Sequence, residues 1–196
     1  MDSFVDLFVA LAKRAGVDDS SIFFTKATLP LPGFFRATKE WDLLIVLDGR
    51  LVAALELKSQ VGSFGNNFNN RTEEAMGSAL DLWTAYREGN IPASSTPFLG
   101  WMMLLENSPA SNKPVRTVEP HFPVRPEFHS ASYTKRYELF CKKLVLERHY
   151  TAAALLTSAQ DSGKRGVYAE PSMDIGIRRF ASGFIEHIRA AIATHD

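Results

Sequence analysis

Three charged residues interrupt two otherwise apolar segments and are the most informative feature of the sequence. Asp42 precedes the apolar run at residues 43–47, and Glu56 and Lys58 flank Leu57 at the end of a second apolar run. Side chains of these types are rarely buried unless they are paired or bind something. In a β-strand Glu56 and Lys58 would share one face, because successive side chains alternate. Whether Asp42 can join them depends on the connection between the two runs.

The connection contains the turn signal Asp48-Gly49, so residues 41–47 and 51–57 are predicted to form a β-hairpin. A two-residue turn would leave Asp42 on the face opposite Glu56, whereas a three-residue loop or an equivalent bulge would place both on one face. We expect the odd loop or the bulge. The opposite face of the second strand is expected to carry Leu51, Ala53, Leu55 and Leu57.

Two converging carboxylates would repel each other, and a hard divalent cation with oxygen ligands, Mg2+, relieves this repulsion most simply. We expect the cation to be held by Asp42, Glu56 and the carbonyl oxygen of Leu57. Lys58 would orient or deprotonate a water and stabilise the charge of a phosphorane-like transition state, which suits phosphodiester hydrolysis. The alternative is an ordinary solvent-exposed pair of Glu56 and Lys58 at a strand end.

The composition limits the kinds of protein that could carry such a site. A chain of 196 residues with 45% hydrophobic and 22% charged residues is typical of a globular protein, and we expect a single domain over residues 1–196. The 22 basic residues balance the 22 acidic ones, which argues against indiscriminate binding to nucleic acid or to anionic membranes. The sequence has no apolar run of the ~20 residues that a membrane span needs and no positively charged leader, which indicates a cytoplasmic protein. Cys141, the only cysteine, excludes an internal disulfide and is expected to be a partly buried helix residue.

Patterns along the rest of the chain predict a mixed α/β domain, with a central sheet that contains the hairpin and is flanked by helices. Apolar residues at helical spacing and capping signals predict helices over residues 2–15, 72–87 and 132–147, and a C-terminal helix that opens near Pro171. A buried strand is predicted at residues 98–105, whereas residues 152–157 fit either a short strand or a continuation of the preceding helix. Breakers and polar residues predict loops at residues 28–35, 59–70, 106–125 and 161–166.

The predicted loop after the second strand carries side chains that are suited to DNA. Asparagine can make paired hydrogen bonds to adenine and arginine to guanine, so the loop could contact base edges or phosphates. The alternative is a turn-rich connector whose asparagines tolerate left-handed backbone. The candidates are Asn66, Asn67, Asn69, Asn70 and Arg71. Arg36 and Lys39, which precede Asp42, could hold the strand that is cut.

Longer stretches around these residues resemble a known nuclease family. Asp42 followed by Glu56-Leu57-Lys58 resembles the PD-(D/E)XK nuclease motif, with Trp41 in the place of its proline. More narrowly, most of residues 29–157 resemble the XhoI family of type II restriction endonucleases. The stretches that carry this likeness are residues 31–36, 39–44, 54–75, 81–87, 120–122 and 136–145.

The resemblance implies a restriction-endonuclease-like fold and Mg2+-dependent cleavage of double-stranded DNA within CTCGAG, leaving 5′ phosphates. It also implies a homodimer whose twofold axis matches that of the site, and a cognate DNA methyltransferase as a genetic rather than physical partner in a restriction-modification system.

The chain departs from the family pattern in two places. It begins later than family members do, so an N-terminal helical segment is expected to be absent. It also lacks a proline between Gly62 and Ser63, so this loop is expected to be one residue shorter. The alternatives are a catalytically impaired DNA-binding remnant and a repair or mobile-element nuclease of the same superfamily.

Overall fold

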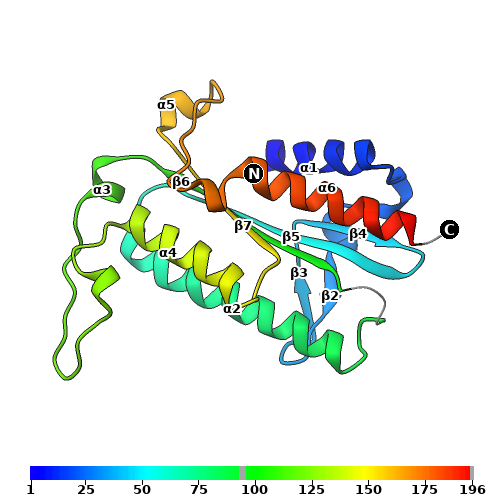
Figure 1. Cartoon of the computed structure of the whole chain (residues 1–196), viewed down its shortest axis with the longest axis horizontal. Coiled ribbons are helices and arrows are strands. Elements are labelled where there is room, and N and C mark those ends of the chain that lie inside the picture. The colour runs from blue at the N-terminus through cyan, green and yellow to red at the C-terminus, as the bar shows by residue number, and fades with distance from the viewer. Residues whose placement is uncertain (93–95, 195–196) are drawn as a thin grey trace.

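The computed structural model describes residues 1–92 and 96–194, and within them five strands form a mixed sheet in the order β1-β4-β5-β6-β7 (Figure 1). β1, β4 and β5 pair antiparallel, whereas β5, β6 and β7 pair parallel. The mixed sheet confirms the predicted fold class. The strands are β1 (Ile22–Phe23), β4 (Leu43–Leu47), β5 (Arg50–Gln60), β6 (Phe98–Glu106) and β7 (Ala152–Ser158).

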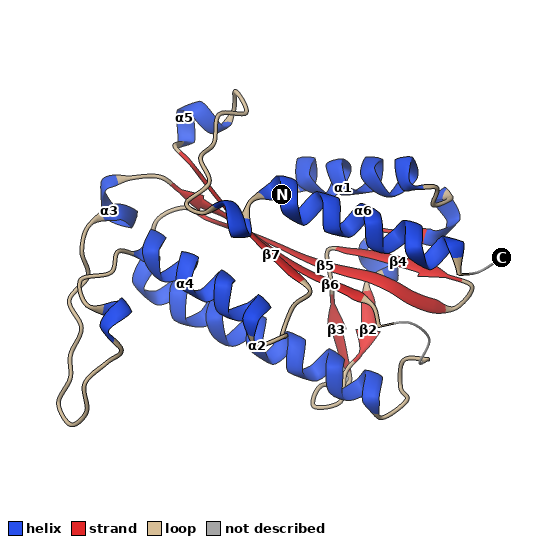
Figure 2. Cartoon of the chain, viewed as in Figure 1, coloured by secondary structure: helices blue, strands red, loops and turns tan. Residues whose placement is uncertain are grey.

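Long helices cover both faces of this sheet (Figures 1 and 2). On one face, Phe8 packs edge-on against Phe180 and Phe184, with ring centroids 5.3 and 5.5 Å apart. On the other face, Tyr137 and Trp101 belong to a second buried cluster. The helices on the first face are α1 (Asp2–Ala15) and α6 (Ile177–Ala193), and those on the second are α2 (Phe64–Arg87) and α4 (Tyr133–Leu146).

The central strands are buried on both faces, which explains their nearly continuous apolar sequences. The packing between β5, β6 and α6 is close enough to demand glycine at position 100. A Cβ atom there would lie 2.5 Å from the side chains of Leu55 and Phe180. The sheet therefore holds β5, the strand that carries Glu56 and Lys58, in a fully packed position.

Helix α2 begins earlier than predicted, and the expectation of a loop over residues 59–70 is wrong. Strand β5 continues to Gln60 and α2 starts at Phe64. Phe64 and Phe68 are one helical turn apart and both pack on Tyr133 of α4, with ring centroids 6.0 and 6.3 Å away. This tertiary contact holds a segment helical whose asparagines and glycine favour turns.

Other boundaries also differ from the predictions. Residues 152–157 form the strand β7, which decides between the two alternatives. The C-terminal helix starts at Ile177 rather than near Pro171, after the 3-10 turn η4 (Met173–Ile175). Further short elements lie in segments predicted as loops or left unassigned. They are η1 (Asp19–Ser21), η2 (Lys26–Thr28), β2 (Pro30–Pro32), β3 (Thr38–Glu40), α3 (Pro109–Asn112), η3 (Pro126–Phe128) and α5 (Gln160–Gly163).

Cys141 is more deeply buried than the sequence predicts. Cys141 lies in α4 and is fully buried, and burial raises the pKa of its thiol, so it acts as a small core residue. Among the residues described, none of the helices combines the length and apolar character that crossing a membrane would require.

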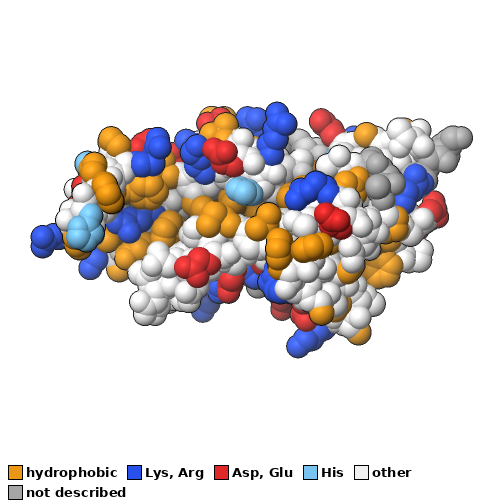
Figure 3. All heavy atoms as spheres, turned by 90° about the horizontal axis from the view of Figure 1, so that it is seen from below, with side chains coloured by type: hydrophobic (Ala, Val, Ile, Leu, Met, Phe, Trp, Pro, Cys, Tyr) orange, Lys and Arg blue, Asp and Glu red, His pale blue; other side chains and the backbone are white. Residues whose placement is uncertain are grey.

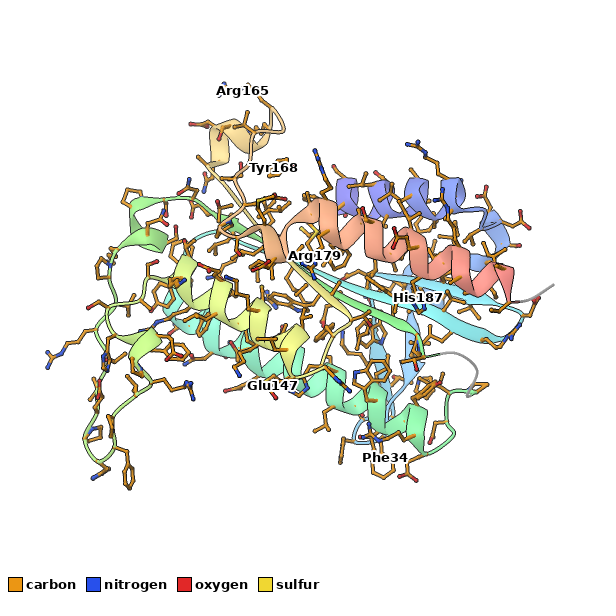
Figure 4. All side chains as sticks on the ribbon, viewed as in Figure 1. Phe34, Glu147, Arg165, Tyr168, Arg179 and His187 are labelled. Carbon is orange, nitrogen blue, oxygen red and sulfur yellow. The ribbon has the colours of Figure 1, made fainter. Side chains whose placement is uncertain are left out.

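A buried carboxylate fixes the turn between β2 and β3. Oδ1 of Asp81, a residue of α2 that is 1% exposed, accepts hydrogen bonds from the backbone N–H groups of Phe34 and Phe35, both at 2.7 Å. Its Oδ2 accepts one from Nε of Arg36 at 2.8 Å. A Cβ on Gly33 would lie 2.5 Å from the same carboxylate, so the turn requires glycine there. The turn therefore presents Phe34 and Phe35 to solvent, and Figure 4 shows Phe34 beside α2.

The hydrogen bonds also set the protonation of Asp81. Burial alone would raise the pKa of this carboxyl, but the Arg36 guanidinium and the backbone N–H groups together hold the pKa below its ordinary value. Asp81 is therefore ionised when the protein is folded at neutral pH.

Asp81→Asn should lower the free energy of unfolding by about 1.5–3 kcal/mol at neutral pH, because the turn loses its charged acceptor. The folded-state pKa lies below that of the unfolded chain, so the stabilisation is complete above the unfolded pKa. It is lost as the pH falls through the folded-state pKa, so the difference from wild type should shrink below about pH 4.

Urea unfolding at several pH values measures both effects. Glu73→Gln, on the exposed side of the same helix, is the matched control. An equal loss in both variants at neutral pH would contradict the role of the buried carboxylate.

Candidate active site

The β4–β5 hairpin turns through two residues and then shifts its register with a bulge. Asp48-Gly49 forms the turn, with φ values of 48° and 75°, as a type I′ turn requires. The pairing shifts between Ile45 and Val46, which leaves Val52 as an extra residue in β5. The bulge supplies the odd residue that the hypothesis required, in place of a three-residue loop.

The bulge changes which side chains share a face. Leu51, predicted to lie with Leu55 and Leu57, instead belongs to the cluster under α2 and α4, because it precedes the extra residue. The bulge lies close to α6, because His187 of that helix, labelled in Figure 4, has a hydrogen bond to the backbone of Val52. Burial lowers the pKa of His187, and this hydrogen bond opposes the shift.

Glu56 lies in the centre of β5 with a side chain that is 2% exposed. Nζ of Lys58 and Nζ of Lys39 each lie 3.0 Å from its Oε1. The hydroxyl of Tyr150 lies 3.2 Å from its Oε2. The buried carboxylate thus has positive charge on one oxygen and a hydrogen-bond donor on the other, as burial of a charge requires.

Asp42 reaches the same part of β5 from the neighbouring strand. Its Oδ2 accepts a hydrogen bond from the N–H of Leu57 at 2.7 Å, and its own N–H donates to the carbonyl of Leu55 at 3.0 Å. The paired ladder ends at Leu43, so Leu57 lies beyond the paired edge of β5. The N–H and C=O of one strand residue point to the same edge. The Leu57 carbonyl therefore also points into the opening that this unpaired edge of β5 leaves beyond β4.

These groups fit a hard, oxygen-binding cation. Asp42, Glu56 and the Leu57 carbonyl are all oxygen donors, and Mg2+ is usually bound through one or two carboxylates while it keeps several waters. Over the described ranges, no group of three or more His, Cys, Asp or Glu residues lies together in a way that could hold a metal. Two carboxylates with a carbonyl are therefore the donor set offered here.

Comparison with known proteins decides the family. The family model described as restriction endonuclease XhoI matches residues 1–170 of the chain. The chain belongs to this XhoI family. Its class is therefore that of type II restriction endonucleases, which hydrolyse DNA.

Three similar proteins are named type II restriction enzymes. BstVI of Geobacillus stearothermophilus is 49% identical over 98% of this chain and 88% of its own length. XhoI of Xanthomonas vasicola is 48% identical over 75% of this chain and 60% of its own, and AbrI of Azospirillum brasilense is 57% identical over 62% and 55%. The chain thus matches less than two thirds of the length of the last two enzymes. No solved structure matches it.

Within this family fold, the residues predicted to hold the cut strand already have carboxylate partners. Arg36 is paired with Asp81, and its side chain is half-exposed. Lys39 is only 14% exposed, and its Nζ lies over the ring of Trp41 at 4.7 Å as well as beside Glu56. The structure thus places Lys39 beside Glu56 and leaves Arg36 at the β2–β3 turn.

The predicted base-reading residues lie on the first turns of α2 rather than in a loop. Three of them are exposed and two are partly buried, because helical spacing turns them toward different sides. The exposed ones are Asn66, Asn69 and Asn70, and the partly buried ones are Asn67 and Arg71. Nη1 of Arg71 is paired with Oε2 of Glu74 at 2.6 Å.

Sequence reasoning named Lys39 only as a possible DNA contact and missed its pairing with Glu56, and it missed Tyr150 altogether. Lys39 lies between Thr38 and Glu40 in a polar segment, so nothing in the local sequence indicates that its side chain turns inward toward Glu56. Tyr150 is 94 residues from Glu56 and follows α4, so no spacing along the chain connects the two. The packing of α4 on β7, together with the pairing of β7 with β6 and of β6 with β5, brings Tyr150 to Glu56.

Lys39→Met should remove one positive charge beside Glu56 and leave the number of contacts with DNA phosphates unchanged. Because its ammonium is paired with Glu56, we expect the slope of log Kd for DNA against log salt to stay constant in metal-free buffer. A lost phosphate contact would reduce the slope by about one. The midpoint of thermal unfolding should fall by about 2–4 °C, equivalent to about 1 kcal/mol in a chain of this size.

Fluorescence anisotropy over a salt series and thermal unfolding supply these values. Lys26→Met, at an exposed lysine, is the control for loss of one positive charge. A reduced salt slope in the Lys39 variant alone would show that Lys39 contacts DNA instead.

Proposed function

We propose that this chain is a Mg2+-dependent type II restriction endonuclease that cleaves double-stranded DNA at CTCGAG and leaves 5′ phosphates. The observation that carries the proposal is the meeting of Asp42, Glu56, Lys58 and the Leu57 carbonyl at the opening beyond β4, in a chain of the XhoI family. The order of these residues is that of the PD-(D/E)XK motif, which supports the assignment of their roles.

Each group in the centre has a distinct task in this proposal. Asp42, Glu56 and the Leu57 carbonyl would hold Mg2+, which when bound supplies positive charge against the charge that develops on the phosphate oxygens. Lys58 would hold the attacking water by a hydrogen bond, or accept its proton, and face the same developing charge. Attack at phosphorus breaks the bond to O3′, so one product carries a 5′ phosphate and the other a 3′ hydroxyl.

The proposed contacts with DNA do not depend on a uniformly basic surface. Basic and acidic side chains are interspersed on the face seen in Figure 3, in keeping with a net charge of zero. We assign the contacts to bases or backbone to the first turns of α2, where Asn66, Asn69 and Asn70 are exposed and Asn67 and Arg71 lie beside them. Asparagine at a helix surface can donate and accept hydrogen bonds at once, which suits base edges.

The proposal includes the partners of the enzyme. Cutting both strands of a palindrome requires two sites related by the symmetry of the DNA, so we propose a homodimer. A DNA methyltransferase encoded nearby would protect the host sequence in a restriction-modification system. We propose that residues 1–196 act as one nuclease domain in the cytoplasm, where incoming DNA is met.

Purified protein with Mg2+ should cut a plasmid that contains CTCGAG into discrete fragments, and sequencing should place the ends within that site. Excess chelator should stop cleavage, because the donor set of the centre needs a cation to act. Discrete ends at another sequence would contradict the specificity. A smear of unrelated ends would favour a repair or mobile-element nuclease, and specific binding without cleavage would favour an impaired remnant.

Asp42→Ala, Glu56→Ala and Lys58→Ala should each lower the cleavage rate at least about a thousandfold, equivalent to about 4 kcal/mol of transition-state stabilisation. Single-turnover cleavage with the plasmid measures the rates, and circular dichroism confirms that each variant is folded. Glu186→Ala, an exposed carboxylate on α6, is the control. Near wild-type cleavage by any of the three variants would remove that residue from the proposed mechanism.

A further inference from the structure

Tyr150 contacts the active centre from the interior of the protein. It lies between α4 and β7 with 1% of its surface exposed. Its hydroxyl oxygen is 3.2 Å from Oε2 of Glu56 and 3.0 Å from the carbonyl oxygen of Ala75 in α2. Both neighbours are acceptors, so the single phenolic proton is directed toward this pair, and the charged carboxylate is the stronger acceptor.

The two oxygens of Glu56 are held by groups of different mobility. Lys39 and Lys58, both beside Oε1, have long side chains that are 14% and 23% exposed, so they can withdraw toward solvent. Tyr150 is enclosed by packed side chains and cannot move without opening the core. Its hydroxyl is therefore the contact that can fix the rotation of the carboxylate when the lysines move.

We propose that Tyr150 is a positioning residue that orients the Glu56 carboxylate for binding of the divalent cation. The inference rests on the proposed function, because it concerns the same centre. Groups that hydrogen-bond to a metal-ligating carboxylate typically contribute 10–100-fold to metal affinity or activity. Without the hydroxyl, the carboxylate would turn toward the two ammonium groups and away from the opening beside Asp42.

A second buried tyrosine offers a matched control. Tyr137 of α4 is also fully buried. Its hydroxyl donates a hydrogen bond to Oε1 of Gln60, which lies on β5 like Glu56. Removal of either hydroxyl takes one donor from a buried polar side chain and keeps the ring. Only the Tyr150 hydroxyl touches Glu56, so a difference between the two variants isolates that contact.

The test compares Tyr150→Phe and Tyr137→Phe with wild type in the full chain. Titration calorimetry without DNA measures Mg2+ affinity, and thermal unfolding without metal measures the stability of each variant. Tyr150→Phe should weaken Mg2+ binding about 10–100-fold, whereas Tyr137→Phe should change it less than about twofold. In cleavage assays, raised Mg2+ should restore most of the rate of Tyr150→Phe, and the KM for DNA should not change.

Wild-type Mg2+ affinity in Tyr150→Phe would overturn the positioning role, and so would equal weakening in both variants, which would indicate general loosening of the core. These results leave the proposed nuclease intact, provided that wild type binds Mg2+ and cleaves. A wild-type protein that neither binds Mg2+ nor cleaves DNA would overturn both proposals.

Discussion

The burial of one carboxylate, that of Glu56, constrains the rest of the structure. A carboxylate this deeply buried is unstable unless other groups compensate its charge and satisfy its oxygens. The compensation comes from separate segments: Lys39 on β3, Lys58 on β5 and Tyr150 after α4. The β2–β3 excursion and the packing of α4 on β7 therefore have to be correct before the centre can exist.

The position of Glu56 in the sheet explains both its burial and its access. β5 pairs with β6 over the whole of the second half of the strand, but β4 ends opposite Leu55. On that edge the backbone N–H of Leu57 donates its hydrogen bond to the carboxylate of Asp42. β5 is thus held by β6 along one edge and unpaired beyond Leu55 along the other. Side chains on this part of the strand can therefore be rigid and still reach a ligand.

Local signals were sufficient to predict much of this arrangement. The turn at Asp48-Gly49 and the apolar runs beside it predict the hairpin, and the alternation of side chains requires an odd residue if Asp42 is to meet Glu56. The residue that provides it, Val52, is an apolar residue in an apolar strand, so no local signal distinguishes it. The helical start of α2 and the place of Tyr150 depend on contacts with α4, which lie outside any local window.

The zero net charge of the chain has a counterpart in the cluster around Glu56. Asp42 and Glu56 carry two negative charges and Lys39 and Lys58 two positive ones, so the formal charges of these residues cancel. Arg36 and Arg71 are likewise paired with Asp81 and Glu74. Under the proposed function, a divalent cation would make the centre positive and attract the phosphate that must be cut. Tight engagement of DNA would then depend on the cation and on specific contacts, rather than on a general excess of basic residues.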